Sequence, residues 1–196
     1  MIILKTRRLV LRSWLETDRD LFREINADPQ VMEFFSFRRS HAQSDQMLEK
    51  LNRMISDTGL GFYAIALRDS DEPIGFCGLA LANVGPALVP DAVEIGWRLA
   101  TRFWGHGYVT EAAAALLDFG FGKKHLPEIV SFAVAKNHRS TAVMQRLGMQ
   151  HDPSRDFDHP RVLDTHPHLK RHVLYTISRA QWARDRGIDI SALAEK

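Results

Sequence analysis

Apolar positions follow two different spacings along the chain, and each spacing predicts one kind of element. Short runs in which apolar residues alternate with polar ones, or stand together between turn-forming residues, predict β-strands. The strands expected on this basis are 9–13, 61–67, 74–82, 92–100, 128–135 and 172–178. Apolar residues three and four positions apart predict helices that begin near Thr17 and span about 44–55, 108–124 and 137–148, with a helical tail over 181–196.

Two helix ends carry local signals. Thr17 and Asp20 have the spacing of a capping box, with Asp in place of the usual Glu, and they predict the start of the first helix. Gly148 stands where a glycine commonly closes a helix, because glycine adopts the left-handed backbone conformation at no steric cost. It predicts the end of the helix that begins near residue 137.

The order of the elements predicts the fold class. One strand and two helices are followed by three strands, after which helices and strands alternate. This order is typical of a mixed α/β (α+β) domain with a mixed sheet and helices on both of its faces. The sequence contains no repeat, low-complexity tract or linker, so 1–196 is interpreted as a single domain in which 183–196 is a charged C-terminal tail.

Composition narrows the classes of protein to which the chain can belong. Of 196 residues, 45% are hydrophobic, enough for one sizeable core, and the net charge of +2 argues against nucleic acid as the main partner. The one cysteine, Cys77, lies in an apolar run and is expected to be a buried structural thiol in a reducing compartment. No stretch resembles a secretion signal or a membrane span, so we expect a cytoplasmic protein without a membrane partner, as a monomer or homodimer.

The segment Arg102–Ala112, RFWGHGYVTEA, combines two glycines with basic and aromatic residues just before an alanine-rich helix. A helix N-terminus attracts anions, because its first backbone N–H groups are unpaired and carry a partial positive charge. Gly105 and Gly107 let the backbone close around a phosphate, while Arg102 and His106 add positive charge. The segment therefore predicts a pyrophosphate site.

Three phosphate-bearing ligands compete for this segment. A P-loop requires Lys and Ser or Thr after its second glycine, where this chain has Tyr108 and Val109. A dinucleotide site requires a small residue in place of Thr110 and an acidic residue at the end of the next strand, where the chain has Lys136 and Asn137. An acyl-coenzyme A requires neither, and it is the ligand that the segment favours.

The stretch from Glu94 to Phe121 resembles the acyl-CoA-binding core of the GNAT N-acetyltransferase superfamily. Arg102, Gly105 and Gly107 fill the family signature, Arg/Gln-x-x-Gly-x-Gly/Ala, in register. The resemblance covers about residues 5–182 and is most similar to the ribosomal-protein-alanine acetyltransferase branch. It implies a GNAT-like fold with a mostly antiparallel, splayed sheet of about six to seven strands. It also implies transfer of an acetyl group from acetyl-CoA to an amine.

The resemblance further implies which residues meet acetyl-CoA. The strand before the loop would pair with the pantetheine arm through its main chain, the loop would wrap the pyrophosphate, and the start of the next helix would face the pantetheine. The implied residues are Ile95, Trp97 and Leu99 for the strand; Arg102, Gly105, His106, Gly107, Tyr108, Val109 and Thr110 for the loop; and Asn137 and Ser140 for the helix. No metal ion is expected to take part.

Glu94 is the expected catalytic base. Attack on a thioester requires a neutral amine, so a group must remove the proton of the amine. In a strand, Glu94 shares a face with Gly96 and Arg98. Apolar neighbours raise the pKa of a carboxylate and bring it toward the range useful for a base. The alternative is a structural ion pair between Glu94 and Arg98.

Three positions bear on the group that protonates the leaving thiolate. Many relatives in the family have a tyrosine four residues before the glycine that ends the relevant helix, where this chain has Met144. Ser140 is a catalytic candidate that could donate a hydrogen bond to the sulfur, or it satisfies backbone N–H groups at the helix start. Tyr175 on the last strand is a further catalytic candidate, although tyrosines in strands usually serve packing.

The segment 151–172 holds five histidines and four aspartates. The spacing gives little support to a metal site, because His166 and His168 stand two apart with a proline between them and no cysteine ligand is near. A solvated loop is the favoured interpretation. The second is an acceptor-binding loop whose aspartates meet a cationic amine, and a metal site is the third.

The sequence leaves three functions open. The favoured one is an N-acetyltransferase that acts on a protein N-terminal α-amine or on a small-molecule amine. The second is an acyl-CoA-binding or regulatory module that has lost its acid chemistry, for which Met144 is the reason. The third is a nicotinamide enzyme.

Overall fold

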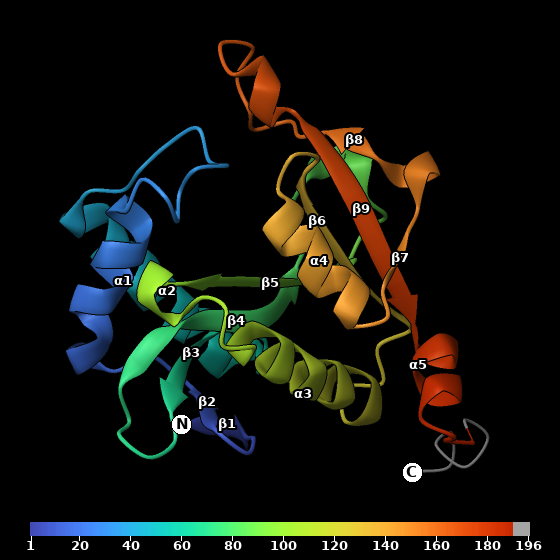
Figure 1. Ribbon diagram of the computed structural model, residues 1–196, viewed down its shortest axis with the longest axis horizontal. Helices are drawn as coiled ribbons and strands as arrows, with labels where there is room; N and C mark the ends of the chain where they lie inside the picture. The colour runs from blue at the N-terminus through green and yellow to red at the C-terminus, as the bar shows by residue number, and fades with distance from the viewer. Residues whose placement is uncertain (190–196) are drawn as a thin grey trace. The chain divides into compact units, whose positions relative to one another are not determined.

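Figure 1 shows the computed structural model, in which residues 1–189 are described. The chain forms two compact units. The first unit comprises Met1–Ala80 and Ile95–Ala115, and the second comprises Leu81–Glu94 and the described residues from Leu116 onward. β5 (Val93–Leu99) and α3 (Tyr108–Gly122) each begin in one unit and continue along the chain into the other. The part of the predicted tail over 190–196 lies outside the described residues.

The strands of the first unit follow one another in the sheet in chain order, from β1 to β5. Their bounds are β1 Ile2–Lys5, β2 Leu9–Arg12, β3 Gly61–Leu67 and β4 Pro73–Leu81, followed by the first-unit part of β5. β1, β2, β3 and β4 pair antiparallel with their neighbours in this series. Cys77 on β4 is fully buried, and burial raises the pKa of its thiol. The prediction of a buried structural thiol is confirmed.

Two helices of the first unit, α1 (Arg19–Ala27) and α2 (His41–Thr58), pack against each other, and α2 packs on β3 (Figure 1). α2 starts three residues earlier than the apolar pattern predicts, because a capping box forms outside that pattern. The backbone N–H of Gln43 donates to Ser40 Oγ at 3.2 Å, and the backbone N–H of Ser40 donates to Gln43 Oε1 at 2.9 Å.

The start of α1 differs from the prediction. Asp18 is the residue before α1, and no side-chain capping hydrogen bond forms there. Asp18 Oδ2 instead accepts from the backbone N–H of Leu15 at 2.8 Å, in the 3₁₀ turn Glu16–Asp18 that precedes the helix. Asp18 is fully buried and forms an ion pair with Arg12 on β2, with an Nη1–Oδ2 distance of 2.6 Å. The predicted capping box of Thr17 and Asp20 is therefore wrong, because the chain enters α1 through a 3₁₀ turn and the helix begins at Arg19 without a side-chain cap.

In the second unit, β6 (Glu128–Val134) and β9 (Arg171–Ser178) pair antiparallel along their length. β9 also pairs with two short strands, β7 and β8, and β6 pairs in parallel with the start of β5. The remaining elements of the unit are β7 Gln150–His151, β8 Phe157–Asp158, α4 His138–Arg146 and α5 Arg179–Asp185.

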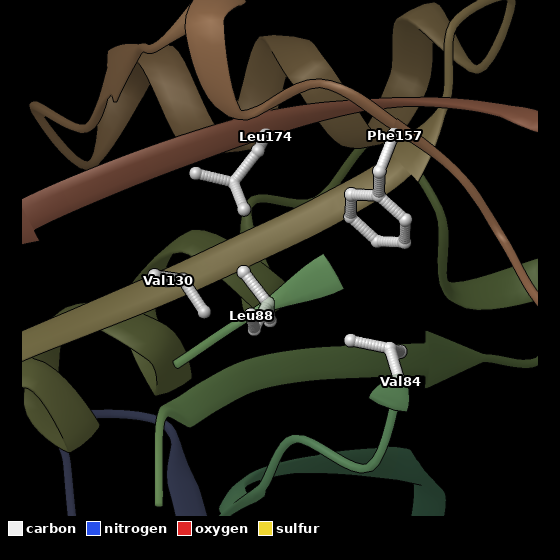
Figure 2. Packing of buried hydrophobic residues seen from close by; sticks show 5 residues of the cluster. All are labelled: Val84, Leu88, Val130, Phe157 and Leu174. Carbon is white, nitrogen blue, oxygen red and sulfur yellow. The ribbon is translucent and has the colours of Figure 1, made fainter. Parts of the chain in front are cut away.

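Apolar side chains from separate elements close the core of the second unit. Figure 2 shows them pointing toward one another from the loop before β5, from β6, β8 and β9. They are Val84, Leu88, Val130, Phe157 and Leu174. Each is at most 8% exposed, so together they form a buried apolar cluster in the unit that contains the start of β5.

The mixed α/β fold and the mostly antiparallel pairing are confirmed, and so is the glycine closure of α4, where Gly148 has φ +78°. The described residues contain nine strands instead of six to seven. β7 and β8 have two residues each, too few to show a period in the sequence, and β1 joins the sheet beside the predicted first strand. The single-domain interpretation stays a prediction.

Candidate functional site

Glu94 lies on β5 where that strand pairs in parallel with Val130 of β6. Protein atoms surround most of its carboxylate, and burial raises the pKa of Glu94 to about 7, the direction predicted from the sequence. The positive charge of Arg161 opposes this rise, although the Arg161 guanidinium itself donates to the Asn83 carbonyl. Within the described residues of its unit, Glu94 has no hydrogen-bond or ion-pair partner. This carboxylate can therefore exchange a proton near neutral pH.

Arg98, the alternative partner of Glu94, has a different contact. Its Nη1 donates to Asn26 Oδ1 at 2.6 Å, and its guanidinium stacks over the ring of Phe35 at 4.5 Å. The charge of Arg39 contributes to the lowered pKa of Arg98, and the charge of Arg161 opposes the rise in the pKa of Glu94. The interpretation of Glu94 as half of a structural ion pair with Arg98 stays a prediction.

The glycine segment forms the turn that the sequence predicts, between a short 3₁₀ turn at Thr101–Phe103 and the start of α3. Gly105 and Gly107 both have left-handed backbones, with φ of +81° and +75°, which residues with a Cβ rarely adopt. A Cβ built on Gly105 would meet no atom within 4 Å, so this side of the loop faces open space. The loop exposes its backbone next to the first N–H groups of α3, as a phosphate cradle requires.

Arg8, which precedes β2, contacts this loop and the first turn of α3. Its Nη1 donates to the His106 carbonyl at 3.0 Å, its guanidinium stacks over Tyr108 at 4.6 Å, and its Nε pairs with Glu111 Oε2 at 2.6 Å. Thr6 Oγ1 donates to the same carboxylate, to Oε1, at 2.6 Å. Sequence reasoning missed this network, because Arg8 and Glu111 are 103 positions apart and no local pattern connects them.

The remaining loop side chains serve packing or ion pairs. Arg102 pairs with Glu24 of α1 and stacks over Phe103 at 4.9 Å, so its charge is shared with a carboxylate of the protein. Trp104 Nε1 donates to the Leu99 carbonyl at 3.0 Å and fixes the turn to the end of β5. The ring of His106 stacks on Tyr108 at 5.6 Å between centroids.

In the first unit the structure brings together β5 and the loop that follows it. The side chains of Ile95 and Leu99 are 1% and 3% exposed, so these side chains are not accessible to a ligand. Trp97 lies between them on the strand and is half-buried. Val109 and Thr110 form the first turn of α3 and are half-buried as well.

The second unit holds the other predicted site residues, at the start of α4 and on β9. Asn137 caps α4, since its Oδ1 accepts from the backbone N–H of Ser140 at 3.1 Å. The capping task proposed as an alternative for Ser140 is therefore performed by Asn137. Met144 is 1% exposed, so α4 offers no acid at the position where relatives have tyrosine.

Tyr175 is 8% exposed, and its ring stacks on His151 with centroids 5.1 Å apart. Its hydroxyl accepts a long hydrogen bond of 3.3 Å from Gln145 Nε2. These contacts agree with a packing role on β9, and the catalytic role of Tyr175 stays a prediction.

The histidine-rich segment 151–172 forms short turns and the strand β8. His151 pairs with Asp156 at 3.0 Å, while His159 and His172 lie 4.9 Å apart between ring centroids. In residues 1–189 no three His, Cys, Asp or Glu side chains gather as metal ligands would. None of the helices in that part of the chain is both long and apolar enough to cross a membrane.

Residues 8–150 match the family model of the acetyltransferase (GNAT) domain. The chain belongs to the GNAT family. Its GNAT-type fold, expected from the sequence, is thereby confirmed, and the chain is an acyltransferase of the N-acetyltransferase kind. Among relatives of this GNAT protein, the FsC-acetyl coenzyme A-N(2)-transacetylase of Aspergillus fumigatus is 27% identical over 188 residues, 92% of this chain and 78% of the relative.

Solved structures agree with the family. An acetyltransferase from Agrobacterium tumefaciens superimposes with a TM-score of 0.70 at 27% identity and covers 89% of this chain and 92% of its own. RimL, a ribosomal alpha-N-protein acetyltransferase in complex with coenzyme A, superimposes with a TM-score of 0.72 at 16% identity over 91% of this chain and 98% of its own. At that identity the likeness to the ribosomal-protein branch is one of fold.

Proposed function

We propose that this GNAT protein transfers the acetyl group of acetyl-CoA to a primary amine by direct attack in a ternary complex. The observation that carries the proposal is Glu94, a carboxylate without a partner in its unit whose pKa of about 7 suits a base at neutral pH. The amine is either a protein N-terminal α-amine or the amine of a small molecule.

Acetyl-CoA supplies the activated acyl group. The backbone of the loop at Gly105 and Gly107 and the first N–H groups of α3 hold the pyrophosphate, since the left-handed glycines leave this backbone exposed. The main chain of β5 from Ile95 to Leu99 pairs with the pantetheine amides. Backbone N–H groups on that strand polarise the thioester carbonyl, which is often the largest catalytic contribution.

Glu94 accepts a proton from the ammonium form of the acceptor. An α-amine with a pKa near 7.8 is roughly one-seventh neutral at pH 7, and a lysine amine is neutral far less often. The neutral nitrogen then attacks the carbonyl carbon and the C–N bond forms, which leaves the nitrogen positively charged. As the intermediate collapses, the C–S bond breaks, and the nitrogen loses its extra proton to water to give the neutral amide. The thiolate of CoA leaves with its electron pair and takes a proton from Ser140, Tyr175 or water.

A second function, an acyl-CoA-binding module without turnover, is favoured by one observation, the buried Met144 at the position of the usual acid. The two functions are separated by measuring release of free CoA thiol from acetyl-CoA while peptides with different N-termini, polyamines and aminoglycosides are added one at a time. We expect at least one amine to accelerate release tenfold or more. CoA binding without acceleration by any amine would favour the binding module.

A further inference from the structure

Two arginines of the first unit, Arg98 and Arg39, both donate a hydrogen bond to Asn26, and neither forms an ion pair with a carboxylate among the described residues. Arg98 on β5 lies between the rings of Phe35 and Phe76, at 4.5 and 5.3 Å, and its buried Nε has no hydrogen-bond partner. Its Nη1 donates to Asn26 Oδ1, so the group is fixed at one end and unpaired along its other edge. Such an orphaned donor is costly in a folded protein unless a ligand satisfies it.

Arg39, in the segment that joins α1 to α2, contacts the same residue as Arg98, Asn26. Its backbone N–H donates to the Asn26 carbonyl at 3.0 Å, and its guanidinium stacks over Phe37 at 4.5 Å. The rings of Phe37 and Phe35 are in contact, 5.8 Å apart between centroids. Burial lowers the pKa of Arg39, and burial together with the charge of Arg39 lowers that of Arg98 to about 9. Each guanidinium therefore lacks a compensating anion.

Other arginines in the unit show what is missing here. Arg8, Arg12 and Arg23 pair with Glu111, Asp18 and Asp45 at 2.6 to 2.7 Å. Among the described residues, no carboxylate contributes to the pKa of Arg39 or Arg98. A desolvated charge pair of like sign destabilises a protein, which leaves a bound anion as the natural partner.

A hollow of about 410 Å³ opens beside Arg39, lined by Phe37, Arg39 and the first turns of α2. Arg38 and Lys50 add positive charge to its wall, while glutamines and Met47 complete it and no acid takes part. Phe37 is 45% exposed at its rim. The hollow is thus lined by basic side chains and by the ring of Phe37, and it has room for a small molecule.

We infer that Arg98 and Arg39 form a carboxylate-binding site and that the acceptor of this enzyme is an amine that carries a carboxylate, such as an amino acid. A planar guanidinium fork suits a flat carboxylate, and its stacking between aromatic rings fixes that geometry. The assignment to the acceptor rests on the proposed function, in which β5, the strand that bears Arg98, also holds the pantetheine arm.

Equilibrium binding tests the site without relying on turnover. The twenty amino acids and their carboxamides are titrated into the full chain in the presence of CoA, by calorimetry. We expect at least one amino acid to bind ten times more tightly than its amide. The absence of such a preference across the panel would overturn the inference, whereas failure of every amine to accelerate thiol release would overturn the proposed function alone.

Variants assign the preference to the two arginines. Arg39→Gln and Arg98→Lys should each reduce the preference for acid over amide at least tenfold. Lysine is used at residue 98 because it keeps the positive charge but lacks the planar fork. Arg53→Gln on α2 is the matched control, because Arg53 is exposed and lies outside the hollow. A preference that survives both variants would contradict the inference.

The phosphates of CoA are the other source of anions, and a second titration separates them. CoA and 3′-dephospho-CoA are each titrated into wild type, Arg39→Gln and Arg53→Gln in the absence of any amino acid. We expect Arg39→Gln to bind both with wild-type affinity within a factor of three. A tenfold loss confined to CoA would assign the arginines to its 3′-phosphate and overturn the inference.

Discussion

Two largely buried carboxylates, Glu94 on β5 and Glu111 in the first turn of α3, have opposite surroundings. Glu111 is 20% exposed and receives hydrogen bonds from Thr6 and from the backbone and side chain of Arg8. Burial would raise its pKa, but these donors lower it below the usual value. The carboxylate of Glu94 is buried and accepts no hydrogen bond from a residue of its unit, and its pKa rises to about 7.

The difference distinguishes a carboxylate that serves the structure from one that can take part in proton transfer. A carboxylate that accepts several hydrogen bonds stays ionised and holds its donors in place, as Glu111 does for the loop that Arg8 contacts. A desolvated carboxylate without donors takes up and releases a proton near pH 7. The contrast predicts that Glu94 controls proton transfer and that Glu111 controls the shape of the cofactor loop.

The largest expected effect is on turnover. Glu94→Gln should lower kcat about 100-fold at pH 8, since general-base catalysis contributes on the order of 10² to 10⁴, and Glu111→Gln should lower it less than threefold. The wild-type kcat/KM should fall as the pH drops below 7, where Glu94 becomes protonated, so the deficit of the Gln variant should shrink there. A deficit that stays constant from pH 5.5 to 8.5 would contradict the role of Glu94.

The second prediction concerns acetyl-CoA affinity and sharpens the role of the loop. Gly107→Val should raise the Kd for acetyl-CoA about tenfold or more, because a β-branched residue disfavours the left-handed backbone by roughly 1–2 kcal/mol and distorts the cradle. Gly187→Val is the matched control, with φ of +64° and no atom near its Cβ. Calorimetric titration measures both. Equal affinities in the two variants would remove the argument for a cradle at this loop.

The glycine loop could be predicted from residues close together in the sequence. The contacts between residues far apart in the sequence could not. The left-handed glycines and the start of α3 follow from neighbours in the sequence, whereas the raised pKa of Glu94 depends on burial in the folded chain. The selection of Asp18 by Arg12 and of Glu111 by Arg8 depends on strands that meet only in the folded unit. The short strands β7 and β8 likewise exist because β9 offers them hydrogen-bond partners.

Stability should respond to pH in opposite directions in the two Gln variants. The pKa of Glu94 is raised, so its stabilising contribution is complete below about pH 4.5 and is lost as the pH rises through 7, by up to roughly 3 kcal/mol. Glu94→Gln should therefore unfold at a higher denaturant concentration than wild type at pH 8. The pKa of Glu111 is lowered, so its contribution is present near neutral pH and is lost in acid.

Glu111→Gln should accordingly be less stable than wild type at pH 7, by roughly 1 kcal/mol, the scale of a partly exposed ion pair with its hydrogen bonds. The deficit should disappear as the pH falls through the lowered pKa of Glu111. Denaturant titrations at pH 4 and pH 7–8 measure both variants. If both variants changed the free energy of unfolding in the same direction at pH 7–8, the contrast between Glu111 as a paired acid and Glu94 as an unpaired one would be contradicted.

The smallest expected effect is at Tyr175, a site candidate whose hydroxyl has a protein donor. Gln145 donates to it at 3.3 Å, and the ring is held by His151, so removal of the hydroxyl leaves the packing intact. Tyr175→Phe should lower kcat less than threefold, measured as thiol release under saturating acetyl-CoA. A tenfold loss, with unchanged affinity for acetyl-CoA, would make Tyr175 the acid and would show that Glu94 works with a partner on β9.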